Sequence, residues 1–123
     1  MAKKIEKLES AELNYKGDIY RLVFNLNVME QIQEEYESVS AWGELTQTAE
    51  EPNAKAVKFG ITCMLNEGIE IYNEEHEDDE DFKPRKLLTD RQVGRIISEV
   101  GLANTTMALK QTVVASTKSD EKN

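Results

Sequence analysis

Alternating apolar and polar positions near the start of the chain predict a β-hairpin. The alternation runs over 13–15, is interrupted by the turn-like 16–18, and resumes over 19–24. Gly17 suits the positive φ of a tight turn. The second strand places three apolar side chains on one face: Tyr20, Leu22 and Phe24. Because an isolated hairpin is marginal in water, we expect this face to pack against helices.

After the hairpin, apolar residues recur at helical spacing. A first helix is predicted to begin at Asn27, because Asn27 and Glu30 form a variant capping box. Its apolar stripe consists of Val28, Met29, Ile32, Tyr36 and Val39. A short helical turn over 41–45, which contains the sole tryptophan, and a polar loop over 46–53 are expected to follow.

A longer helix is predicted after the polar loop, with Pro52 at a first-turn position where proline is tolerated. Its wide apolar stripe is typical of a central, buried helix. The stripe comprises Ala54, Val57, Phe59, Ile61, Cys63, Met64, Leu65, Ile69, Ile71 and Tyr72. Gly60 indicates a close crossing with another element. Gly68 indicates a cap, a bend or a break, and the periodicity leaves these alternatives open.

Two capping signals in the C-terminal part of the chain predict the start and the end of a helix. Thr89 and Gln92 form a capping box, and Gly101 fits the position after a helix end. A last helix is expected over 104–115, and the polar residues 116–123 are expected to be disordered. The chain therefore predicts a single domain over 1–115. Its fold class is mainly α, a small α+β domain with an N-terminal β-hairpin followed by about four helices.

The net charge of −9 is concentrated in one segment. Residues 74–81 (EEHEDDED) carry seven acids and no Lys or Arg, so they supply −7 and leave −2 for the rest of the chain. We expect a solvated acidic loop over 74–86. Since no basic stripe is evident along the sequence, binding to nucleic acid is not expected. Nor does any apolar run approach the roughly 20 residues that cross a bilayer.

Residues that could support catalysis are few. The single histidine, His76, lies within the acidic segment, where a solvated side chain is the simpler interpretation than a catalytic or zinc role. The acids lack the spacing and the glycine of a calcium-binding loop. The lone Cys63 cannot form an internal disulfide and is expected to be a buried apolar residue. We therefore predict no enzyme activity, no metal and no cofactor.

Four motifs follow one another along residues 13–110. They are Gly17-Asp-Ile-Tyr20-Arg-Leu22, the helix from Asn25 to Tyr36, Met64-Leu65-Asn-Glu-Gly68, and the segment from Leu88 to Gly101. Their order resembles that of the tail assembly chaperones of long-tailed bacteriophages, prophages and gene-transfer agents. Members of that family tend to show a G-x-x-Y-x-L hairpin and an L-T-x-x-x-V-G-x-x-I helix. The acidic loop and the polar C-terminal residues depart from the shared pattern.

The resemblance implies a protein that acts in the cytoplasm of a bacterial host and is absent from the mature virion. It also implies two partners, the tape measure protein and the tail tube protein, and leaves a homo-oligomer open. A helix of the client is expected to dock in a groove. We expect four exposed apolar residues to contribute to partner binding: Trp42, Leu45, Phe59 and Tyr72.

Three other interpretations compete with this one. A head-completion or head-tail connector protein has a similar size and helix content, but it would persist in the particle. An acidic decoy that mimics DNA needs acids spread over a whole face, whereas here they lie in one loop. An enzyme would need metal-dependent chemistry within 74–81.

Overall fold

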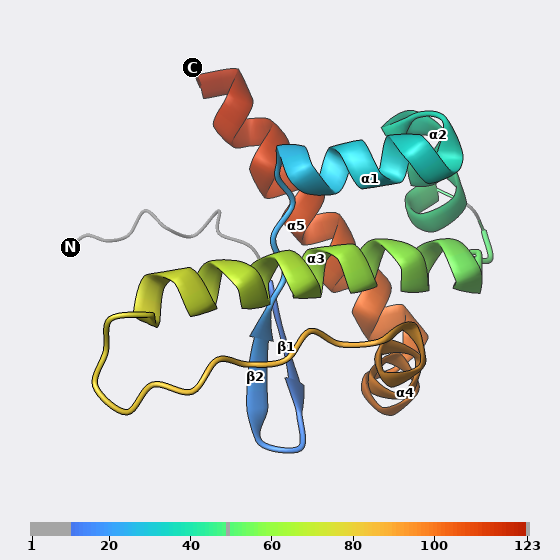
Figure 1. Cartoon of the computed structure of the whole chain (residues 1–123). Helices are drawn as coiled ribbons and strands as arrows, with labels where there is room; N and C mark the ends of the chain where they lie inside the picture. The colour runs from blue at the N-terminus through green and yellow to red at the C-terminus, as the bar shows by residue number, and fades with distance from the viewer. Residues whose placement is uncertain (1–10, 49, 123) are drawn as a thin grey trace.

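The computed structural model describes residues 11–48 and 50–122. Its elements, in chain order, are β1 (Glu12–Tyr15), β2 (Asp18–Arg21), α1 (Leu26–Tyr36), α2 (Val39–Gly43), the π-helical turn η2 (Glu44–Thr48), α3 (Ala54–His76), α4 (Asp90–Val100) and α5 (Leu102–Lys122). The predicted small α+β fold is confirmed, with five helices where about four were expected (Figure 1). Residues 1–10 of the predicted domain and residue 123 of the predicted tail lie outside the described residues.

The two strands form the predicted hairpin. They pair antiparallel with Leu13 opposite Tyr20, and the two-residue turn has positive φ at both Lys16 (51°) and Gly17 (86°). This is the turn geometry that matches the twist of the flanking strands. Leu13 and Leu22 are buried, whereas Ile19 on the other face is exposed. The predicted inward face of the hairpin is therefore confirmed.

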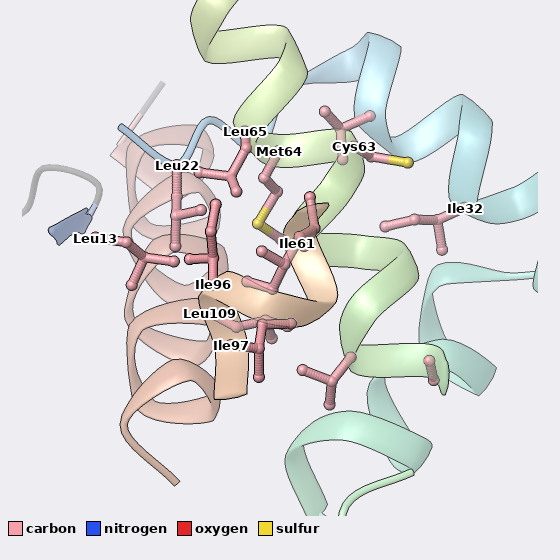
Figure 2. Packing of buried hydrophobic residues seen from close by; sticks show 14 of the residues in the cluster. Leu13, Leu22, Ile32, Ile61, Cys63, Met64, Leu65, Ile96, Ile97 and Leu109 are labelled. Atoms are coloured by element: carbon pink, nitrogen blue, oxygen red, sulfur yellow. The ribbon is translucent and has the colours of Figure 1, made fainter. Parts of the chain in front are cut away.

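Helix α3 is the central element, as its wide apolar stripe predicts. It crosses the middle of the molecule between α1 and the hairpin (Figure 1), and it packs against the hairpin and the other helices. Figure 2 shows Ile61, Met64 and Leu65 of α3 close to Leu22 of the hairpin and Ile96 of α4. These side chains belong to one continuous apolar cluster that also includes residues of α1 and α5. One core therefore holds the described elements together.

Two glycines let other elements approach α3 closely. A Cβ at Gly60 would collide with the indole ring of Trp42, so the predicted close crossing is confirmed. A Cβ at Gly68 would lie 2.5 Å from the backbone carbonyl oxygen of Arg21 at the end of β2. Helix α3 continues through Gly68 to His76 without a break. Gly68 is thus neither a cap nor a helix break, but the point where the hairpin contacts α3.

The predicted starts of α1 and α3 are shifted by one or two residues. Asn25, not Asn27, caps α1, and its side-chain oxygen accepts a hydrogen bond from the Val28 backbone N–H (3.3 Å). Asn27 instead donates to the Glu67 carboxylate of α3 (3.1 Å), as does Asn25 (2.8 Å). Glu67 thereby places a negative charge beside the N-terminus of α1. In α3 the cap is Asn53, so Pro52 precedes the helix instead of entering its first turn.

The capping box of α4 is confirmed at both ends of the motif. The Thr89 hydroxyl accepts from the Gln92 backbone N–H (3.1 Å), and the Gln92 side chain accepts from the Thr89 backbone N–H (2.8 Å). The helix ends at Gly101, whose φ of 103° is costly for any other residue. Local sequence signals therefore define both ends of α4.

Substitution of Thr89 by alanine should lower the free energy of unfolding by about 1 kcal/mol, since one cap hydrogen bond is lost. Urea unfolding followed by circular dichroism measures this change. Thr106→Ala is the matched control, because Thr106 is an interior residue of α5 whose hydroxyl bonds only its own helix, to the Leu102 carbonyl. Alanine there should be neutral or slightly stabilising. Equal losses in both variants would contradict a specific role for the cap.

Helix α5 is longer than the sequence pattern predicts. It starts at Leu102, two residues before the expected start, and its backbone remains helical to Lys122. The backbone of residues 116–122 thus continues the helix, whereas their polar composition led us to expect a disordered tail. These residues contain no glycine or proline, so nothing in them stops a helix that tertiary packing has already nucleated.

Candidate functional site

Trp42, predicted to be an exposed partner-binding residue, is fully buried. Its ring lies in the slot left by Gly60, and its indole N–H donates to the backbone carbonyl of Ala56 (3.0 Å). The ring also stacks on Phe24, with 6.3 Å between centroids. The prediction is wrong because the slot is formed between α2 and α3, and helical spacing does not reveal which glycine faces which aromatic residue. Trp42 is a core residue.

The other three predicted residues do not form one surface. Leu45 lies on η2 and is 36% exposed. Phe59 is half-buried and contacts Tyr36 edge-on, with 5.6 Å between centroids. Tyr72 is 38% exposed and lies thirteen residues further along α3 than Phe59. These positions contact different neighbours, so their exposure alone does not define a binding site.

Tyr72 belongs to a cluster that fixes the chain after the acidic segment. The Arg85 guanidinium lies over the rings of Tyr72 (4.9 Å) and Tyr20 (5.4 Å), and it donates to the Ile19 carbonyl (3.3 Å). Phe82 contacts Tyr72 with 5.9 Å between ring centroids. Arg85 therefore joins the returning chain to both α3 and the hairpin through cation–π contacts.

Two asparagines of α3 hold the same returning chain by its backbone. Asn66 donates to the Leu88 carbonyl (3.0 Å) and accepts from the Leu88 N–H (2.7 Å). Asn73 makes the same pair of bonds with Arg85, at 3.0 and 2.9 Å. Each side-chain amide thus bonds both the N–H and the C=O of one residue, as the backbone of a neighbouring strand would. The predicted solvated loop over 74–86 is wrong at both ends, because 74–76 are helical and Arg85 is anchored.

His76, the histidine within the acidic segment, makes two local contacts. His76 Nδ1 lies 2.7 Å from a carboxylate oxygen of Asp79, and the His76 ring contacts the Tyr72 ring at a tilt of 40°, with 4.4 Å between centroids. Within residues 11–48 and 50–122, no three His, Cys, Asp or Glu side chains gather closely enough to hold a metal ion. His76 therefore takes part in a local turn contact.

An apolar groove lies where α3 begins, beside α4 and the start of α5. It encloses about 430 Å³, and we call it the α4 groove. Its lining residues are Ala54, Lys55, Lys58, Gly94, Ile97, Ser98 and Leu102. Three of these side chains are very small, so a partner could approach the backbone of α3 and α4 closely. Leu102 is 38% exposed and offers apolar surface at the mouth of the groove.

The α4 groove continues into a hollow lined by several Lys and Arg side chains, which we call its basic end. The two share Lys58, Gly94 and Ser98. The other residues lining the basic end are Tyr15, Lys16, Arg91, Arg95 and Glu99. Lys58 pairs with Asp90 (3.0 Å), and Lys16 lies over the Tyr15 ring at 5.3 Å. A chain of net charge −9 thus has a local concentration of positive charge.

Sequence reasoning missed this groove because its residues come from four separate elements. A partial signal exists within each helix. Arg91 and Arg95 are four residues apart, and Lys55 and Lys58 are three apart, so each pair shares a helix face. Both faces border the α4 groove or its basic end only because of how α3 and α4 pack, and no local sequence pattern indicates that packing.

Cys63 is buried, as predicted. Burial raises the pKa of its thiol to about 11. The nucleophilic thiolate is therefore scarce near neutral pH. The geometry agrees with a small apolar side chain in the core and provides no activated nucleophile at this position.

Comparison with known proteins returns no match among family models, curated proteins or solved structures. Among the described residues, no helix is both long enough and apolar enough to span a membrane. The α4 groove is thus the feature on which a functional proposal can be built.

Proposed function

We propose that this protein is a non-enzymatic tail assembly chaperone of a long-tailed phage. It acts in the host cytoplasm, binds the tape measure protein through the α4 groove, helps recruit tail tube subunits, and is absent from the mature virion. One observation carries the proposal. Gly94 and Ile97, both part of the L-T-x-x-x-V-G-x-x-I motif behind the family resemblance, line the groove.

The groove suits an apolar face of a client helix. Gly94 and Ser98 lie one helical turn apart on α4 and line the groove with the flexible side chain of Lys58, while Ile97 and Leu102 supply apolar contact. Binding of this type uses a few apolar anchors spaced along one helix face. Helix α5 adds a further apolar stripe, since Met107 and Val114 are exposed and lie seven residues apart. These surfaces support a protein that shields an apolar client during assembly.

Co-expression with a tape measure protein, followed by pull-down, tests this function. The wild-type chain should retain the client, and Leu102→Lys should weaken binding roughly tenfold by placing a charge in the groove. Leu26→Lys is the matched control, because Leu26 is 78% exposed on α1 and does not line the groove. A folded wild-type chain that retains no client, or equal loss in both variants, would contradict the proposal.

Mass spectrometry of purified virions distinguishes a chaperone from a connector protein. A chaperone should be missing from particles that contain the tail tube and tape measure proteins. Detection of this chain at the copy number of a structural ring would exclude a chaperone role, whatever the pull-down shows.

A further inference from the structure

The basic end of the α4 groove carries cations without an internal partner. Within the part of the chain that the structure describes, three cations that line it, Lys16, Arg91 and Arg95, pair with no carboxylate. All three side chains are exposed. Glu99 is the one acid that lines the hollow, and Asp90 is engaged by Lys58. Positive charge therefore exceeds negative charge at this place, although the chain as a whole is acidic.

The acidic segment 74–81 has the opposite imbalance. Among the described residues, no Lys or Arg pairs with a carboxylate of this segment, and Asp79 contacts His76 Nδ1 at 2.7 Å. Glu74 and Glu75 also lie in the last turn of α3, where the helix dipole disfavours negative charge. Lys or Arg side chains at this position would relieve both effects. The nearby Arg85 is already engaged with Tyr20 and Tyr72.

These two regions lie at opposite ends of α3. Lys58, through which α3 contributes to the basic end, is in its second turn, and the acidic segment starts in its last turn (Figure 1). At about 1.5 Å per residue, the sixteen residues from Lys58 to Glu74 separate the two by roughly 24 Å. One molecule therefore cannot fold its own acidic segment into its own basic end.

We propose that the basic end of the α4 groove binds the acidic segment 74–81 of a second copy of this chain. The occupant follows from charge complementarity between two regions that are each unbalanced within one copy. Two copies can exchange this contact reciprocally in a closed dimer, or repeat it from copy to copy in a ring or an open filament. This self-association is independent of the client proposed above.

Sedimentation velocity of the full chain over a concentration series tests the proposal. The wild-type chain should self-associate at low salt and dissociate as ionic strength rises, since salt screens these charges. Arg91→Glu with Arg95→Glu should weaken association roughly tenfold or more, and so should Asp78→Lys with Glu80→Lys. An equimolar mixture of these two double variants should associate again, because each supplies the charge that the other lacks.

Gln33→Glu, Lys110→Glu and Gln111→Glu together provide the matched control. They change the net charge by the same amount as the Arg91/Arg95 variant, but all three side chains are exposed and none lines the basic end or the hollow beside Glu75. Association should be retained in this control, with circular dichroism confirming that every variant is folded. A wild-type chain that is monomeric at low salt, or equal loss in the control, would overturn the proposal. So would a monomer whose basic end binds an acidic client peptide instead.

Discussion

Replacement of Trp42 by alanine is expected to lower the free energy of unfolding by about 3–5 kcal/mol. The side chain is fully buried, fills the slot at Gly60 and bonds the Ala56 carbonyl. Its removal leaves a large cavity that α2 and α3 cannot close without moving toward each other. Since small domains have total stabilities of about 5–15 kcal/mol, this loss is a large share of the total. Urea unfolding followed by circular dichroism measures it.

Trp42→Phe is the control for this experiment. Phenylalanine keeps most of the apolar contact with Phe24 but loses the indole hydrogen bond, so a smaller loss of about 1–2 kcal/mol is expected. A change below about 1 kcal/mol in the alanine variant would be typical of a surface residue. That result would restore Trp42 as a candidate for partner binding and contradict the burial described above.

Substitution of Gly68 by alanine is the second change with a large expected effect, a loss of about 1–3 kcal/mol. The new Cβ would lie 2.5 Å from the Arg21 carbonyl oxygen, which is backbone and cannot rotate away. The hairpin is also held next to this point by the Val23 N–H, which donates to the Met64 carbonyl (3.3 Å). Thermal or urea unfolding would report the loss, and Gly68→Val should be worse.

Gly94→Ala tests the same substitution where it causes no clash. Gly94 is also inside a helix, but the nearest neighbour of a new Cβ is Lys58 Cδ at 3.4 Å, in a flexible side chain. The usual preference of helices for alanine should then dominate, with a gain of up to about 1 kcal/mol. If Gly68→Ala were equally well tolerated, the close contact between α3 and the hairpin would be refuted.

Local features of the fold could be predicted because their causes are local. The two ends of α4 follow from Thr89, Gln92 and Gly101, and the hairpin turn follows from Gly17. The start of α1 could not be predicted in the same way. Two asparagines compete for the cap there, and both also donate to Glu67, about forty residues away in the sequence, a contact that local signals do not reveal.

The candidate site was less predictable than the fold for the same reason. The burial of Trp42 was not predicted, because it depends on the space left by Gly60 in a different helix. The α4 groove combines residues of the hairpin, α3, α4 and α5, and the helix-face pairs indicate only fragments of it. Sequence periodicity states which residues share a helix face, but not which faces of different helices meet.

The paired asparagines of α3 have a consequence for how the chain can vary. Asn66 and Asn73 are seven residues apart, about 10.5 Å along a helix, and their partners Leu88 and Arg85 are three residues apart, about 10 Å in extended chain. An insertion or deletion between them would break this match of lengths and shift α4. Residues 77–81 lie outside the matched interval, so insertions there should leave the core unchanged. Residues 77–81 of the acidic segment are thus free to change in length and charge between related chains without affecting the rest of the fold.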